Sequence, residues 1–65
     1  MSYVIRFHWP RDPDRVGYED ESKYGIATHI EDARTYLNRH EVNKRLPAYR
    51  DAYLIWGITT SVEEV

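Results

Sequence analysis

The sequence predicts a small two-layer α+β domain, in which a three-stranded sheet carries one helix on one face. Three observations predict this fold class. Residues 3–8 alternate with the period of a strand, residues 30–40 carry apolar side chains at helical spacing, and residues 52–60 form the most hydrophobic run. A further short apolar stretch at 24–28 completes the predicted order of strand, long loop, strand, helix and strand.

The chain has 65 residues, which is enough for a single hydrophobic core, so residues 1–65 are interpreted as one domain. There is no cysteine, which excludes a disulfide framework and a thiolate metal site. The N-terminal stretch 1–12 has neither a signal-peptide core nor the ~20 apolar residues of a membrane span. We therefore expect a cytoplasmic protein that does not associate with membranes.

The first strand is predicted from the alternation within residues 3–8, which places the odd-numbered residues on one face and the even-numbered ones on the other. Pro10 and Pro13 follow closely, and proline cannot donate a hydrogen bond to a sheet. The strand should therefore end by Trp9. The second strand, at 24–28, is too short and too rich in β-forming residues for a helix.

The predicted helix follows the second strand directly. Thr28 and Glu31 have the spacing of a capping box, in which each side chain hydrogen-bonds the backbone N–H of the other end of the motif. From there the apolar side chains fall within about 120° of arc at the helical repeat. The apolar face predicted in this way consists of Ile30, Ala33, Tyr36, Leu37 and His40.

The end of this helix is predicted from the residues that follow it. Val42 and Leu46 lie on the opposite side of the same helical wheel, so a straight continuation would expose them to water. We therefore expect the main helix to end or bend between residues 40 and 43. Val42 and Leu46 then form an i, i+4 pair on a separate turn, which Pro47 terminates.

The last strand is predicted at 52–60, where both alternating faces are largely apolar, as in a central strand or one that meets a partner. The acidic tail 61–65 is expected to fray. The order of the strands is open at this point. A right-handed parallel crossover and an antiparallel return are both compatible with the sequence.

Motifs that would carry enzyme chemistry are absent from the sequence. Asp12–Gly17 matches three positions of a calcium loop, but Val16 and Lys23 stand where oxygen ligands are needed. His29 and His40 lie about 16 Å apart on the predicted helix, too far to share a metal ion. There is no glycine-rich phosphate loop and no nucleophile motif. We expect no catalytic residues, no cofactor and no metal, and hence no enzyme.

The charges are unevenly distributed along a chain whose net charge is -2. Residues 10–32 contain seven acidic and three basic side chains, and residues 33–50 contain five basic and one acidic. The basic segment 34–50 is interleaved with tyrosines, which could stack on unpaired bases while the cations contact phosphates. This gives an alternative function, a nucleic-acid-binding accessory protein that uses Arg39, Lys44, Arg45 and Arg50.

The favoured interpretation is a non-enzymatic protein-binding module. The loop 9–22 combines an acidic triplet with large aromatic side chains, and aromatic residues make up 14% of the chain. A sheet covered by one helix would also expose an apolar face, which would bind another protein or a second copy of the chain in a homodimer. Alternatively, the loop covers that face itself. The residues predicted to bind a protein partner are Trp9, Tyr18, Glu19, Asp20, Glu21, Tyr53 and Ile55.

The layout of the chain resembles a group of known small proteins. YVIRF, a polar segment containing Trp and Tyr, YGIATHIEDARTYLNRH and AYLIWGIT follow one another in this order. This pattern resembles the short uncharacterised ββαβ accessory proteins encoded by bacteriophages and by bacterial genomes that carry them. The resemblance implies an inhibitor or adaptor that binds a host or phage macromolecule, and it brings no catalytic residues with it.

Overall fold

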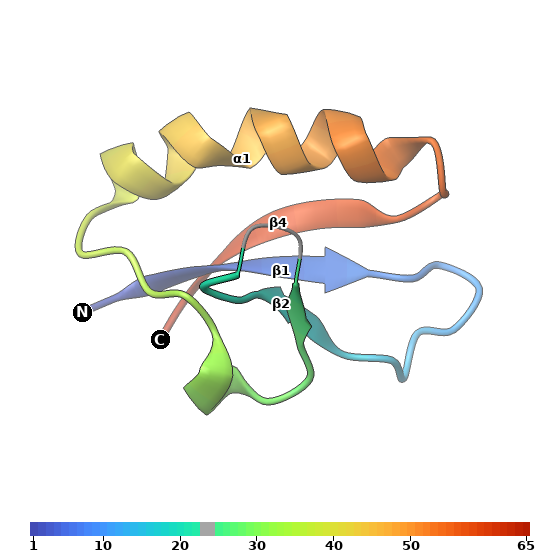
Figure 1. Ribbon diagram of the computed structural model, residues 1–65, viewed down its shortest axis with the longest axis horizontal. Helices are drawn as coiled ribbons and strands as arrows, with labels where there is room; N and C mark the ends of the chain where they lie inside the picture. Colours follow the sequence, from blue (N-terminus) through green and yellow to red (C-terminus); the bar gives the residue numbers. More distant parts are fainter. Residues whose placement is uncertain (23–24) are drawn as a thin grey trace.

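The computed structural model describes residues 1–22 and 25–65 and shows a helix lying on one face of an antiparallel sheet (Figure 1). The α+β class is confirmed, but the sheet has four strands rather than three. In the part of the chain that is described, no helix is both long and apolar enough to span a membrane. The elements are β1 (Tyr3–His8), β2 (Gly17–Glu19), β3 (Ile26–Ala27), the 3₁₀ turn η1 (Ile30–Asp32), α1 (Arg39–Leu54) and β4 (Thr59–Glu64).

The strands are ordered β3-β2-β1-β4, and each neighbouring pair is antiparallel. β1 is central, with Phe7 opposite Gly17 on β2 and Ile5 opposite Val62 on β4. The sequence leaves open whether the last strand runs parallel or antiparallel to the strand before the helix. In the structure it runs antiparallel. The additional strand, β2, lies inside the segment predicted to be a long loop.

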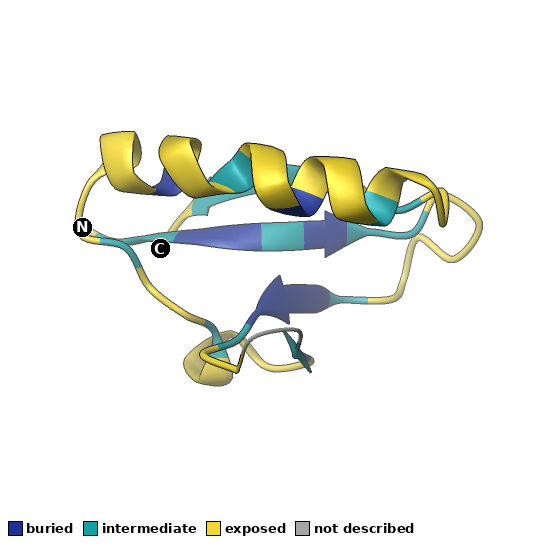
Figure 2. Cartoon of the chain, turned by 45° about the horizontal axis from the view of Figure 1, so that its top comes forward, coloured by how far each residue is buried: buried dark blue, intermediate teal, exposed yellow. Residues whose placement is uncertain are grey.

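The core lies between α1 and the face of the sheet formed by the odd-numbered residues of β1. Ile5 and Phe7 are fully buried there against Val42 and Tyr49 of α1. Figure 2 shows buried positions along β1 and on the side of α1 that faces the sheet. The predicted bounds of β1 are confirmed. Burial does not follow the alternation at Val4, which is fully buried on the opposite face with Tyr18 and Ala27.

The helix predicted from residue 30 is wrong, since only the short 3₁₀ turn Ile30–Asp32 forms there. No side chain caps that turn, so the capping box predicted at Thr28 does not form. The helix begins instead at Arg39, where the Asn38 side chain accepts a hydrogen bond of 2.9 Å from the Glu41 N–H. Asn38 and Glu41 have the same spacing as the pair that was expected to cap.

Residues 33–36 are held away from helical geometry by bonds to distant parts of the sheet. Tyr36 and Tyr3 exchange two backbone hydrogen bonds, of 2.8 and 2.9 Å. The Arg34 N–H donates to the Glu19 carbonyl oxygen at 2.7 Å. These bonds satisfy the backbone in an extended conformation, so the apolar spacing of the segment does not lead to a helix.

The expected helix end near residues 40–43 is also wrong. Val42 is buried and Leu46 packs against the core, and both belong to one helix that continues past Pro47. The helix runs from residue 39, so residues 42–53 share one helical repeat. Its apolar face consists of Val42, Leu46, Tyr49 and Tyr53, at spacings of four, three and four residues. Pro47 is exposed on the outer side and does not terminate the helix.

The strand predicted at 52–60 is wrong for its first half, which is helical up to Leu54. Gly57, at φ 74°, ends the helix in a Schellman motif: its N–H donates to Leu54, and the Ile58 N–H donates to Tyr53. The tail expected to fray is the strand β4. The strand predicted at 24–28 is realised at Ile26–Ala27, and its first residue lies outside the described residues.

Candidate functional site

Three consecutive apolar residues are exposed where α1 ends. Leu54, Ile55 and Trp56 are 58%, 80% and 74% exposed. Consecutive residues at a helix end point in different directions, so they cannot all face the core. The turn at Gly57 fixes the path of the chain here and directs it back into β4. These exposed side chains are therefore held on an ordered turn next to the sheet.

Trp9 lies opposite this turn, at the end of β1, and its indole ring is held on several sides. Its ring meets the Phe7 ring edge-on at 6.5 Å, and the Arg15 guanidinium lies 4.3 Å from its centroid. The loop beneath it is fixed by backbone bonds from Asp12 to Trp9 and from Arg15 to Asp12. A Cβ on Gly17 would lie 2.5 Å from the Trp9 ring, so this position requires glycine.

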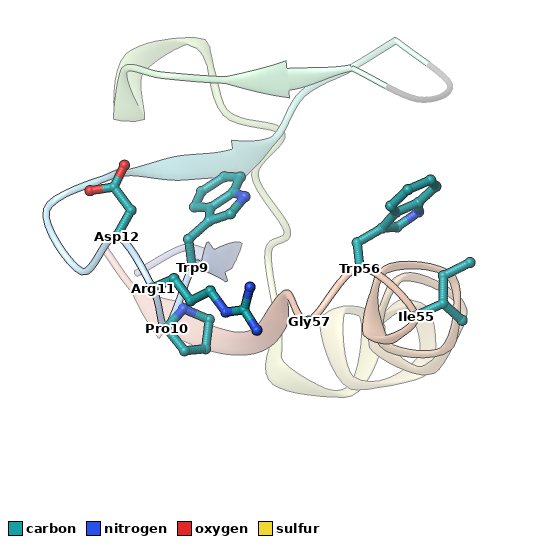
Figure 3. Close-up of a pocket in the computed structure, with 7 residues that line it drawn as sticks. All are labelled: Trp9, Pro10, Arg11, Asp12, Ile55, Trp56 and Gly57. Carbon is teal, nitrogen blue, oxygen red and sulfur yellow. The ribbon is translucent and has the colours of Figure 1, made fainter.

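The two segments form a hollow of about 410 Å³, called the tryptophan groove here. Trp9–Asp12 line one side and Ile55–Gly57 the other (Figure 3). Trp9 and Trp56 stand on opposite sides of the hollow. The Arg11 side chain extends from the loop towards Gly57, and the Asp12 carboxylate points away from Trp56 (Figure 3). An apolar groove with a charged rim has the composition of a protein-binding site.

The predicted partner-binding residues are distributed unequally around this groove. Trp9 and Ile55 line it. Tyr53 lies beneath it, half-buried with its ring 4.7 Å from that of Phe7, and belongs to α1 rather than to an open sheet face. Tyr18 is only 7% exposed in β2 and packs against Val4 on the face away from α1. It is therefore a core residue on that face.

The acidic triplet 19–21 does not form one solvated surface. Glu19 is fully buried, because β2 alternates and turns Tyr18 to one face of the sheet and Glu19 to the face under α1. The Asp20 carboxylate accepts bonds from the Ser22 N–H and hydroxyl, at 2.8 and 2.6 Å. Glu21 is exposed. The expectation of a continuous acidic contact region is therefore wrong at Glu19.

Glu19 is instead the centre of a polar cluster between the sheet and the helix. The Tyr36 hydroxyl donates to its Oε1 at 2.5 Å, and the Arg45 Nε lies 3.6 Å from its Oε2. Burial raises the pKa of Tyr36 well above its ordinary value, and the bond to Glu19 adds to the rise. Burial also raises the pKa of Tyr49. The cluster ties β2, the segment before α1 and α1 itself together.

The basic residues predicted as a nucleic-acid surface are divided by the helix. At 100° per residue, Arg39 and Arg50 lie about 20° apart, whereas Arg45 lies about 120° from Arg39 on the other flank. Arg45 is turned towards Glu19 of β2, and Lys44 points outward, away from the buried side of α1. The four cations therefore do not make one continuous surface.

Sequence reasoning missed five of the residues that line the site, which are Pro10, Arg11, Asp12, Trp56 and Gly57. The signal for Trp56 was present in Gly57, which could have been recognised as the residue after a helix end rather than as part of a strand. Comparison with known protein families, with curated proteins and with solved structures finds no match for this chain. The geometry of the tryptophan groove is therefore the main observation that bears on function.

Proposed function

We propose that this protein is a non-enzymatic protein-binding module, acting as an adaptor or inhibitor, and that the tryptophan groove is its contact site. The observation that carries the proposal is the exposure of Ile55 and Trp56 beside Trp9, around one hollow. Tryptophan and arginine are the side chains most enriched at the energetic centres of protein interfaces. Both are present at this groove, as Trp9, Trp56 and Arg11.

The size of the domain supports the same proposal. Burying a large apolar side chain stabilises a protein by roughly 1.5–3 kcal/mol, and a chain of this length has few such side chains to use. Leu54, Ile55 and Trp56 are nevertheless kept outside the core. Their burial against a partner would supply binding energy that folding leaves unused.

The charged residues on the loop side of the groove would orient a bound partner. Arg11 and Asp12 carry opposite charges on the loop side, and Arg15 lies against the Trp9 ring. A partner side chain that enters between the two segments would meet the Arg11 guanidinium there (Figure 3). Such rim charges contribute more to orientation and specificity than to affinity.

The proposal is tested by affinity capture with the tagged chain, with and without nuclease, comparing the wild type with an Ile55→Ser, Trp56→Ser double variant. The matched control is Leu37→Ser, because Leu37 is 86% exposed at the other end of α1. We expect a nuclease-resistant protein partner that the double variant loses and the control keeps. Binding to the purified partner should fall at least about a hundredfold, as for loss of two central anchors.

Two outcomes would contradict the proposal. One is equal capture by the double variant and by the wild type, with both proteins folded by circular dichroism. The other is a partner that nuclease treatment removes, since this would favour the nucleic-acid alternative. The substituted side chains are exposed, so the thermal midpoint of the double variant should stay close to that of the wild type.

A further inference from the structure

A second hollow, of about 350 Å³, lies beside the first half of α1 and is here called the arginine hollow. We propose that it binds a single phosphate group of the phosphate-monoester class. It shares no lining residue with the tryptophan groove, so this site is additional to the proposed protein contact. Its lining residues are Arg34, Tyr36, Glu41, Lys44 and Arg45.

The charge around the hollow favours an anion. Arg34, Lys44 and Arg45 supply three positive charges, against one carboxylate at the rim, Glu41, and one beneath, Glu19. The local sum is therefore +1, in a chain whose total is -2. In the described part of the chain, no carboxylate lies within ion-pair distance of Arg34 or Lys44. Two of the three cations are thus available to a ligand.

The two arginines are also held in place before any ligand arrives. The Arg34 backbone is bonded to the Glu19 carbonyl, and the Arg34 guanidinium lies 5.7 Å from the Tyr36 ring centroid. The Arg45 guanidinium lies 5.5 Å from the Tyr49 ring centroid, with its Nε directed towards Glu19. Arginine side chains that are already ordered lose less conformational entropy when they bind.

The types of donor around the hollow suit a phosphate group. Arg45 also lines the hollow, with its Nε 3.6 Å from Glu19 Oε2. Guanidinium groups pair with phosphate oxygens through two parallel bonds, and Lys44 adds a compact positive charge. A dianionic phosphate can accept from all three side chains, which come from the segment before α1 and from two successive positions on it.

The proposal is tested by titrating the labelled chain with inorganic phosphate and with O-phosphoserine, at constant ionic strength in chloride, and following the backbone amide signals. We expect saturable shifts confined to residues 34–36 and 41–45. Arg34→Gln and Lys44→Gln should each weaken binding about tenfold, as for the loss of one charge-assisted bond. Arg39→Gln and Arg50→Gln remove the same charge from the opposite flank and should weaken binding less than about twofold at this salt concentration.

Glu41→Gln provides a test in the opposite direction. Removing the rim carboxylate takes away a like charge, so phosphate should bind several-fold more tightly, while the backbone N–H that Asn38 caps is kept. A chain that bound phosphate through its surface charge alone would respond equally to Glu41→Gln and to Asp51→Gln. Asp51 is an exposed carboxylate later in α1, so it serves as the matched control.

The proposal is overturned if phosphate produces no more shift than chloride does, or if all four Arg and Lys variants weaken binding equally. Tighter binding of a single-stranded oligonucleotide that depends on Arg39, Lys44 and Arg50 alike would overturn it in favour of the nucleic-acid alternative. The Ile55→Ser, Trp56→Ser variant should bind phosphate normally. The experiments therefore distinguish failure of the phosphate site from failure of the proposed protein contact.

Discussion

Glu19 shows how a single residue in this chain has a role that its sequence neighbours do not suggest. It is part of the acidic run 19–21, yet it is fully buried and bonded to the Tyr36 hydroxyl. Its Oε2 accepts no hydrogen bond from the described residues, and the Arg45 Nε lies 3.6 Å from it. Buried carboxylates are tolerated when their partners are in place and are costly to disrupt.

Glu19→Ala should lower the free energy of unfolding by about 2–4 kcal/mol, because it leaves the Tyr36 hydroxyl without an acceptor and opens a cavity. Glu19→Gln keeps an acceptor for Tyr36 and should cost only about 1 kcal/mol. Urea unfolding of the two variants checks this order. Equal stability of the alanine variant and the wild type would show that the cluster does not support the fold.

Tyr36 leads to a prediction about pH. Burial holds its pKa above the ordinary value, so at high pH the unfolded chain loses this proton while the folded chain keeps it. The stabilisation is fully present below the ordinary tyrosine pKa of about 10 and is lost as the pH rises beyond it, with a slope of roughly 1.4 kcal/mol per pH unit.

Tyr36→Phe should remove this part of the alkaline slope, although it lowers stability at neutral pH because Glu19 loses a donor. Urea unfolding between about pH 8 and about pH 11 measures both effects. Tyr49, whose pKa burial also raises, should account for part of the slope that persists. An unchanged slope in the variant would contradict the assignment to Tyr36.

At the scale of elements, the two ends of α1 are determined by a polar residue at its start and a glycine after its end, rather than by the spacing of its apolar residues. Asn38 caps its first turn, and Gly57 ends it through a Schellman motif. Pro47 inside the helix is the exception, since proline has no N–H for the Asn43 carbonyl and normally disrupts a helix interior. Burial of Val42 and Tyr49 outweighs this cost.

Pro47→Ala should therefore raise the free energy of unfolding by about 1–2 kcal/mol, since it restores the missing hydrogen bond and removes no buried contact. Ala48→Gly, at the next exposed helical position, is the matched comparison and should lower it by about 1 kcal/mol. Thermal or urea unfolding measures both. A loss of stability in Pro47→Ala would indicate that α1 is not continuous at this position.

The strands differ in how far their own sequence predicts them. β1 was predicted with its bounds, because six alternating residues ended by proline have few other interpretations. β2 and β3 are short, and β4 contains polar and charged residues, so none of the three has a strong pattern of its own. They form because the central strand β1 gives β2 and β4 a partner for their backbone groups.

At the scale of the whole molecule, the sheet order brings two distant segments together. The loop after β1 and the turn before β4 meet because β1 and β4 are neighbours and run in opposite directions. This places Trp9 and Trp56 around one groove, although they are 47 positions apart in the chain. Of that site, the sequence predicts Trp9 as an aromatic anchor in the loop 9–22. It predicts Ile55 on an open sheet face, which is wrong, because Ile55 follows the last turn of α1. It does not predict Trp56.

The sequence by itself determined the α+β class, the strand β1 and the lack of cysteine chemistry. Only the tertiary structure decided where α1 and β4 begin and end, and which acidic residue is buried. The physical reason is that short apolar runs fit a helix or a strand equally well. Contacts made at a distance, such as the bridge between Tyr3 and Tyr36 and the burial of Glu19 under α1, choose between them.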